Sequence, residues 1–371
     1  MTFVFSAEQE ELRAVVRRFL ASKSPETEVR RLMETPDGYD AAVWRMMATQ
    51  LGLQGLTIPE EYGGAGYGFV ELIVVLEEMG RALLPAPYFS TVVLAASALL
   101  LSDDEAARKE YLPGIAIGET IATLAFVEPN ARWDLDGIEM SATKTPQGYR
   151  LEGIKSFVLD GHTASLILTA ARTDGGLSLF AVDEAAPGLV RTPLTAMDGT
   201  RKLAKLEFSG VPARLIGPAG GAEAVLRKTL DLAAVAMSVE AVGGARKCLD
   251  MAVEYAKVRV QFGRPIGSFQ AIKHKCADML LEVEGARAAA YHAAWAAAED
   301  SAEVPVVASL AKACCSEAFF QCAADNIQIH GGIGFTWEHP AHLYYRRAKS
   351  AEQLFGRPTY HRELLAQRLG I

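Results

Sequence analysis

The chain has 371 residues, of which half are hydrophobic and 22% are charged, and its formal net charge is −8. This length predicts two or three domains, because a single hydrophobic core stops growing at roughly 250–300 residues. The acidic balance argues against nucleic acid as the main partner, since binding to phosphates needs a basic excess.

Three features predict a cytoplasmic protein. The five cysteines show no CxxC pair, which predicts reduced thiols (Cys248, Cys276, Cys314, Cys315, Cys322). Residues 1–12 lack the basic and apolar regions of a signal peptide. The longest apolar run, residues 91–101, has about half the length that a membrane-spanning helix needs, so we expect no membrane segment.

Residues 1–115 predict a helical domain. Ser6 and Gln9 have the spacing of a capping box, and apolar residues follow at helical intervals (Leu12, Val15, Val16, Phe19, Leu20). A glycine-rich loop at residues 58–69 lacks the GxGxxG spacing of a dinucleotide-binding turn. Helical patterns then resume as far as Leu101.

Residues 116–217 predict a β domain, because the segments from 121 to 215 are short, rich in Val, Ile, Thr and Phe, and separated by turns such as TPQGY. Residues 218–371 predict a helical bundle. Its long, Ala-rich and amphipathic segments run over 222–258, 268–298 and 304–329. The sequence therefore predicts an α+β multidomain protein with helices, a sheet and helices in succession.

Histidines offer a possible metal site. His339 and His342, with His361 downstream, could begin a zinc site, but no further ligand stands at a convincing distance and Pro340 lies between the first two. Surface or interface histidines are the preferred interpretation, and we expect no metal. The sequence also has no GxSxG, no Walker loop and no Cys–His pair at a favourable spacing.

Two segments interrupt the predicted bundle with the composition of ligand clamps. RVQFGRPIGSFQ (residues 259–270) has two arginines, an aromatic residue and a Gly-Arg-Pro break, and a new helix is expected from Ser268. QIHGGIGFTWEHP (residues 328–340) has three glycines that would let the backbone approach a ligand. Taken singly, each is equally well explained as a helix–helix corner with a glycine C-cap.

Together the two segments resemble the acyl-CoA dehydrogenase family. The resemblance covers almost the whole chain and includes PEEYGG (59–64), DGTRKLAKLEFSGVPARLIG (198–217), YAKVRVQFGRPIGSFQAIKH (255–274) and QIHGGIGFTWEHPAHLYYRRAK (328–349). It implies an N-terminal helical domain, a middle β-barrel and a C-terminal four-helix bundle. It also implies α,β-desaturation of an acyl-CoA, in which a carboxylate removes the α-proton and FAD takes the β-hydrogen as hydride. A flavoprotein electron acceptor is implied as a partner.

The resemblance also implies a role for the two corners. In the family they hold the ADP half of FAD, mainly that of a neighbouring subunit, so an oligomer such as a tetramer is expected. A guanidinium suits a pyrophosphate, and glycines let backbone N–H groups approach it. The matching residues are Arg259, Phe262, Gln270, Gln328, Gly331 and Gly332.

The chain departs from the family at the catalytic base. The usual Glu stands six residues after the Lys of an R-x-A-K run and directly before a Gly, and Phe355 occupies that position here. The alternative position, on the helix before the Arg-x-x-Phe-Gly corner, is Ala233, and Ala234 stands where an Arg commonly follows. No catalytic residue is therefore identified.

Glu240 is a weak candidate for a displaced base. It follows Ala233 by two helical turns and lies on nearly the same face of an apolar helix. The preferred interpretation is a buried structural acid that is paired with an Arg or a backbone donor.

The β domain departs from the family as well. The family has a Thr before Glu-Pro, where this chain has Val127 after Phe126. Where W-x-T closes on the flavin ring, it has Phe157 and Leu159. A buried flavin edge without partners would lose roughly 1–3 kcal/mol for each missing bond.

Three hypotheses remain. The first is a base-lacking partner subunit that completes the FAD site of a homologous catalytic chain, in the β-oxidation of a fatty acyl or steroid side chain. The second is an active homo-oligomer, such as a homotetramer, with a displaced base. The third is a flavin-free scaffold, against which the retained clamp residues argue, since a scaffold would have no reason to keep them.

Overall fold

The computed structural model describes residues 5–371. Residues 1–4, part of the stretch without signal-peptide features, lie outside the described residues. The chain forms two compact units. The helical unit contains the residues up to Arg30, Phe69–Leu84 and Ala234–Ile371, and the barrel unit contains Arg31–Gly68 and Pro85–Ala233.

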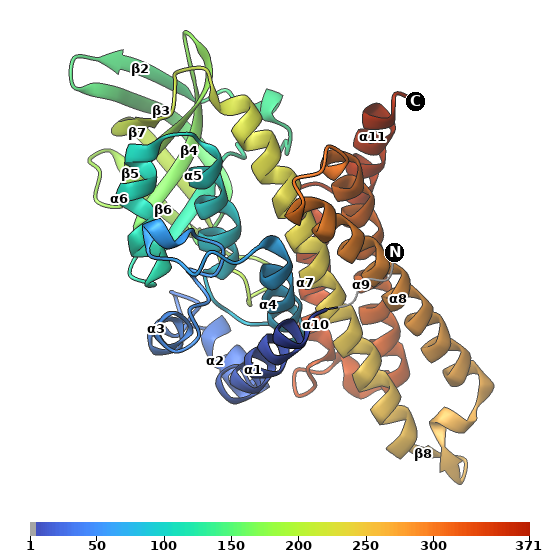
Figure 1. Cartoon of the computed structure of the whole chain (residues 1–371). Helices are drawn as coiled ribbons and strands as arrows, with labels where there is room; N and C mark the ends of the chain where they lie inside the picture. The colour runs from blue at the N-terminus through green and yellow to red at the C-terminus, as the bar shows by residue number, and fades with distance from the viewer. Residues whose placement is uncertain (1–4) are drawn as a thin grey trace. The chain divides into compact units, whose positions relative to one another are not determined.

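The helical unit is built on long helices, as the Ala-rich amphipathic segments predict, and Figure 1 shows α7, α8 and α9 running beside one another. The helix α7 begins in the barrel unit and continues through the helical unit. The helices of this unit are α1 (Ala7–Lys23), α4 (Phe69–Ala82), α7 (Ala222–Val258), α8 (Gln270–Ala298), α9 (Val304–His330), α10 (Ala341–Gln353) and α11 (Pro358–Leu369).

The predicted capping box at the start of α1 is confirmed. The Ser6 hydroxyl accepts from the Gln9 backbone N–H at 3.2 Å, and the Gln9 side chain accepts from the Ser6 backbone N–H at 2.9 Å. These bonds satisfy N–H groups that a helix start leaves without partners. Val16 and Leu20 are buried from the predicted apolar face.

Helices α4 and α7 pack with their backbones in close contact. A Cβ added to Gly80 would lie 2.0 Å from the carbonyl oxygen of Glu240, and one added to Gly243 would lie 1.9 Å from that of Glu77. Only glycine fits at either crossing point, so the contact fixes α4 against α7 within the helical unit.

Helix α9, with the 3-10 turn η5 (Gly331–Phe335), is long and apolar enough to cross a membrane by length and composition alone. The sequence prediction considered only the shorter apolar run at residues 91–101. In the structure, 67% of the apolar window is buried inside the protein. A helix that is apolar on most sides and buried on most sides is typical of a bundle core.

The corner between α7 and α8 is a short hairpin. Strand β8 (Val260–Gln261) pairs with β9 (Arg264–Pro265), and a 3-10 turn, η4 (Ile266–Ser268), follows. The expected helix start at Ser268 is therefore wrong by two residues. Phe269 is extended at φ −83° and ψ 134°, and α8 begins at Gln270.

The barrel unit combines a seven-stranded sheet with short helices. The chain enters it through α2 (Glu26–Met33), and the predicted glycine-rich loop contains the 3-10 turn η1 (Glu60–Tyr62). The π-helix η2 (Phe89–Ala96) overlaps the start of the predicted apolar run and is buried throughout. The remaining helical segments are α3 (Ala41–Thr49), α5 (Ser97–Leu101), α6 (Glu105–Ala116) and η3 (Leu135–Gly137).

The sheet closes into a barrel, as predicted. The strands β2, β3, β7, β5 and β4 pair in a ring, and one register pair, Ser141↔Arg172, joins β2 to β4. Strand β1 adds to β4 in parallel and β6 adds to β7. The strands are β1 (Ala122–Ala125), β2 (Ser141–Thr145), β3 (Gly148–Leu159), β4 (Leu166–Thr173), β5 (Gly176–Asp183), β6 (Leu189–Leu194) and β7 (Leu203–Ile216). The three-domain limits drawn from the sequence stay predictions.

Candidate functional site

At the tip of the β8–β9 hairpin, Phe262 has an unfavourable backbone conformation and an exposed side chain. Phe262 and Gly263 form the two-residue turn with φ of +53° and +75°, and the Phe262 side chain is 90% exposed. Such turns favour Asn-Gly or Gly-Gly, because other side chains are strained at positive φ. A large apolar side chain that is both strained and exposed indicates a site whose occupant covers it.

Arg259 lies at the base of the same hairpin. Its backbone N–H donates to Tyr255 at 2.9 Å and its carbonyl accepts from Ile266 at 2.7 Å, so the backbone is fixed. The guanidinium is exposed and makes no hydrogen bond or ion pair with any of residues 5–371. Arg264, by contrast, lies over the Phe269 ring at 4.2 Å. Arg259 is thus the hairpin arginine that is available for an anion.

The second corner, residues 328–340, exposes its backbone. Gly331 ends α9 at φ +64°, and a Cβ added to Gly331 or Gly332 would meet no atom within 4 Å. Gln328 is exposed beside them. Phe335 and Trp337, which follow, are 82% and 61% exposed. The glycines therefore leave the backbone accessible to a ligand and are not needed to make room for a neighbouring helix.

Two contacts bring the corners to the same end of the bundle. The Tyr255 ring, at the end of α7, stacks on the His330 ring, at the end of α9, with centroids 4.2 Å apart. Lys275 on α8 pairs with Asp325 on α9 at 2.5 Å. We call Arg259, Phe262, Gln270, Gln328, Gly331 and Gly332 the clamp residues.

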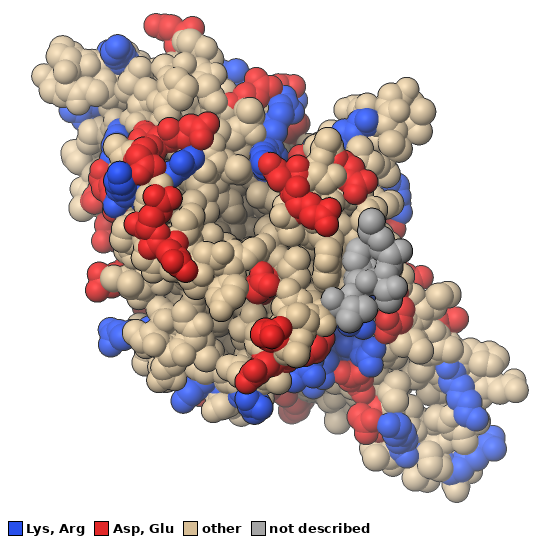
Figure 2. Space-filling model, in the orientation of Figure 1, with Lys and Arg blue, Asp and Glu red and all other residues tan. Residues whose placement is uncertain are grey.

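The charge at this end suits an anion. Residues 255–277 contain five Lys or Arg and no acidic residue, although the whole chain has a net charge of −8. Figure 2 shows blue side chains grouped at the lower right, around the end that carries the hairpin. Fixed positive charge around an exposed arginine favours binding of a pyrophosphate.

The four barrel residues singled out in the sequence lie on neighbouring segments. The Ser156 backbone N–H donates to the Val127 carbonyl at 2.8 Å, next to Phe126, and Leu159 ends β3. Val127 and Leu159 are buried, whereas Phe157 is 41% exposed at φ +56°, within a bulge of β3. Phe157 is the member of this group that presents a large surface to a ligand.

A buried ion pair beside these residues was missed by the sequence reasoning. Lys155 is fully buried, and its Nζ lies 2.7 Å from Glu128 Oε1 and 3.3 Å from the Phe126 carbonyl. Glu128 also accepts from the backbone N–H groups of Glu139 and Met140. Burial lowers the pKa of Lys155 to about 8, against the opposing effect of Glu128. A charged residue in β3 (Lys155) and another just after the apolar strand β1 (Glu128) are the signal that could have revealed this pair.

Phe355, at the usual base position, is buried between α10 and α11. It is 5% exposed at φ +61°, and its carbonyl contacts His361 Nε2 at 2.9 Å. Lys312 on α9 donates to the carbonyls of Ala351 and Gly356 at 2.9 and 3.2 Å. Burial lowers the pKa of Lys312 to about 7. The loop is held firmly, but its Phe355 side chain can accept no proton.

Ala233, the alternative base position, is fully buried and carries no ionisable group. Glu240 is 6% exposed, and its Oε1 lies 2.5 Å from Nη1 of Arg347, which is 2% exposed. The carboxylate therefore forms part of a buried ion pair, which is the arrangement expected of a structural acid.

The histidines form an aromatic cluster. The His330 and His339 rings lie 4.2 Å apart, and His342 packs against Trp337. Burial lowers the pKa of His330, His339 and His342. Among residues 5–371, no group of three or more His, Cys, Asp or Glu could hold a metal ion.

Three family models match the chain in order. They are "Acyl-CoA dehydrogenase, N-terminal domain" at residues 6–119, "Acyl-CoA dehydrogenase, middle domain" at 123–211 and "Acyl-CoA dehydrogenase, C-terminal domain" at 220–370. The chain belongs to the acyl-CoA dehydrogenase family. Members of this family of oxidoreductases normally bind FAD.

Individual relatives support the same family assignment. The chain is 35% identical over 353 residues to acyl-CoA dehydrogenase IpdE2 of Mycobacterium tuberculosis, covering 95% of this chain and 94% of that one. It is similar to the ChsE4-ChsE5 complex from Mycobacterium tuberculosis, with TM-score 0.90, 29% identity and coverage of 100% and 99%. It is also similar to the Tcur3481-Tcur3483 steroid ACAD, with TM-score 0.89, 30% identity and coverage of 98% of both chains.

Proposed function

We propose that this chain is the base-lacking subunit of a two-chain acyl-CoA dehydrogenase. Its clamp residues hold the ADP half of an FAD whose flavin ring lies in a homologous partner chain. The partner supplies the carboxylate and the polar contacts to the flavin. The assembly oxidises an acyl-CoA thioester in the cytoplasm and passes electrons to a flavoprotein acceptor.

The clamp carries this proposal. Phe262 is strained and 90% exposed, and Arg259 is exposed without a partner among residues 5–371. The strain and the exposed ring of Phe262 cost stability or solubility in the chain alone, so their presence is best explained by an occupant. The aromatic ring offers a face to a flat group, the guanidinium pairs with a pyrophosphate, and Gly331 and Gly332 admit its oxygens to backbone N–H groups.

The absence of a catalytic carboxylate in this chain is the reason for proposing a second chain. When bound, FAD accepts the β-hydrogen as hydride, and a carboxylate must remove the α-proton. Phe355 and Ala233 cannot do so, and Glu240 is paired with Arg347. The similarity to two assemblies that are each named for two proteins supports a second chain.

The active homo-oligomer remains a second candidate, because Glu240 is a carboxylate in the helix that bears the alternative base position. Its ion pair with Arg347 argues against it, since removing a proton from a substrate would require that pair to be broken. The scaffold candidate leaves the strained, exposed Phe262 without a purpose.

The test is co-expression with an acyl-CoA dehydrogenase chain of the same organism that carries the catalytic Glu. We expect the chain alone to lack flavin absorbance and turnover, and the two-chain complex to be yellow and to reduce a ferricenium dye with acyl-CoA. Arg259→Gln should lower the FAD content of the complex, whereas Arg362→Gln, at an exposed arginine of α11, should not. Turnover by the chain alone at ordinary rates would overturn the proposal.

A further inference from the structure

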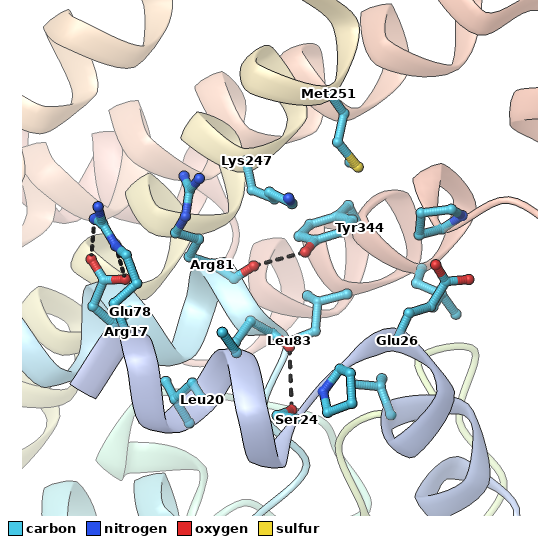
Figure 3. Close-up of a pocket in the computed structure, with 16 residues that line it drawn as sticks. Arg17, Leu20, Ser24, Glu26, Glu78, Arg81, Leu83, Lys247, Met251 and Tyr344 are labelled. Carbon is cyan, nitrogen blue, oxygen red and sulfur yellow. Dashed lines mark hydrogen bonds and ion pairs between the residues drawn. The ribbon is translucent and has the colours of Figure 1, made fainter. Parts of the chain in front are cut away.

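A cavity in the helical unit includes none of the clamp residues. It has a volume of about 280 Å³ and is lined by α1, the start of α2, the end of α4, α7 and the start of α10 (Figure 3). Nothing in the proposed FAD function uses it. Its lining includes Leu20, Leu83, Arg81, Lys247, Met251 and Tyr344.

One side of the cavity is apolar. Leu20, Leu83 and Leu343 are each at most 2% exposed, and Met251 completes this wall. The Tyr344 hydroxyl already has a partner, because it donates to the Arg81 carbonyl at 2.7 Å (Figure 3). A hydrocarbon body can therefore be buried here without leaving a polar group unpaired.

The acidic residues of the lining are already neutralised. Glu78 accepts from both Arg17 Nε and Arg17 Nη2, at 2.8 and 2.6 Å. Glu26 pairs with Arg30 at 2.7 Å. These pairs leave no net negative charge to repel an anion.

One basic side chain of the cavity is not neutralised. Arg81 pairs with Asp250 at 2.7 Å, and Arg246, which lies 3.2 Å from Asp250, also pairs with Glu284 at 3.1 Å. Lys247, one turn before Met251 on α7, makes no hydrogen bond or ion pair with the described part of the chain, and Figure 3 shows it extending toward Tyr344. Burial and the charge of Arg81 lower the pKa of Lys247, and the charge of Asp250 opposes this only in part.

We propose that this cavity binds an amphipathic monocarboxylate, with the carboxylate on Lys247 and Arg81 and a compact hydrocarbon body against the leucine wall. One negative charge matches the single unpaired lysine. The volume lies near the lower end of ligand sites, which run from about 300 to 1,000 Å³, so the ligand is a free acid and not a thioester with its CoA. The site is independent of the FAD function proposed above.

Octanoate is a suitable probe, because it combines one carboxylate with a short hydrocarbon chain. Binding is measured by calorimetry and by thermal unfolding on the purified full chain. Octan-1-ol and octylamine have the same chain and test the charge. We expect octanoate to bind and stabilise, octan-1-ol to bind more weakly, and octylamine to show no binding.

Variants locate the site. Lys247→Met keeps an unbranched side chain without the charge and should weaken octanoate binding by about tenfold, the effect of one lost charge-assisted hydrogen bond. Ala82→Leu at the end of α4 fills the cavity and should abolish binding. Lys144→Met, at an exposed lysine of the barrel unit, should leave the affinity unchanged.

Three results would overturn the proposal. They are no binding of octanoate, equal affinity for octanoate and octan-1-ol, and unchanged octanoate affinity in folded Lys247→Met and Ala82→Leu. Thermal unfolding of the free variants establishes that they fold. Arg259→Gln should bind octanoate normally, so a failure of the FAD proposal is distinguishable from a failure of this one.

Discussion

The buried ammonium of Lys312 lies 3.2 Å from the carbonyl oxygen of Gly356, the residue after Phe355. It also donates to Ser316 Oγ and to the Ala351 carbonyl, at 3.0 and 2.9 Å. Lys312 on α9 therefore holds the loop between α10 and α11 in place. Its hydrogen-bond acceptors are a hydroxyl and two carbonyls, all of them uncharged. Such a cation costs stability when it is protonated, because neutral acceptors compensate only part of its lost hydration.

This arrangement predicts a pH dependence. The pKa of Lys312 is lowered from about 10.5 to about 7 by burial. Between these values the unfolded chain holds one more proton than the folded chain, so this group makes stability rise with pH. The unfolding free energy of the natural chain, minus that of Lys312→Met, should therefore rise from pH 7 to pH 10.5. Its slope should be at most about 1.4 kcal/mol per pH unit. Urea unfolding across this range measures the difference, and parallel profiles would contradict the assignment.

Glu240 should prove structural and not catalytic. Glu240→Gln removes one charge of the buried Glu240–Arg347 pair inside the helical unit, and we expect a loss of about 3–5 kcal/mol of unfolding free energy. Glu240→Gln combined with Arg347→Met removes both charges and should recover part of that loss. Turnover of the two-chain complex, per folded molecule, should change little in the double variant. A well-folded variant without turnover would instead support Glu240 as the base.

We expect Phe262 to lower the stability of the isolated chain and to contribute to FAD binding. Asn is favoured at positive φ in a two-residue turn, so Phe262→Asn should stabilise the isolated chain by about 1 kcal/mol. The same change removes the ring that the FAD proposal uses, and the FAD content of the complex should fall. Phe335 is 82% exposed without a positive φ, so Phe335→Asn is the matched control and should not stabilise the chain. Equal thermal shifts in the two variants would show that the turn is not strained.

The sequence predicted those features that depend on neighbouring residues. The Ser6–Gln9 capping box, the long helices and the order of helices, barrel and helices all follow from local spacing. The start of α8 was missed by two residues, because a 3-10 turn and an extended Phe269 also satisfy the local signals.

Partners that are distant in the chain could not be predicted. The sequence indicated that Glu240 needs a counter-charge, but Arg347 lies 107 residues away and only packing selects it. The three acceptors of Lys312 and the pairing of Lys155 with Glu128 also arise from tertiary packing. The clamp residues were named by family resemblance, and the strain at Phe262 became visible only in the backbone.

The missing base provides the sharpest test of the proposed half-enzyme. Phe355→Glu places a carboxylate at the usual position, on a loop that Lys312 and His361 already hold. We expect the lone variant to remain without turnover, because Val127 and Leu159 are buried apolar groups where the family offers hydroxyls to the flavin. Phe355→Gln is the matched control for folding, and flavin absorbance together with dye reduction is the measurement. Turnover in lone Phe355→Glu would show that this chain holds a whole flavin by itself, and that its only deficit is the carboxylate.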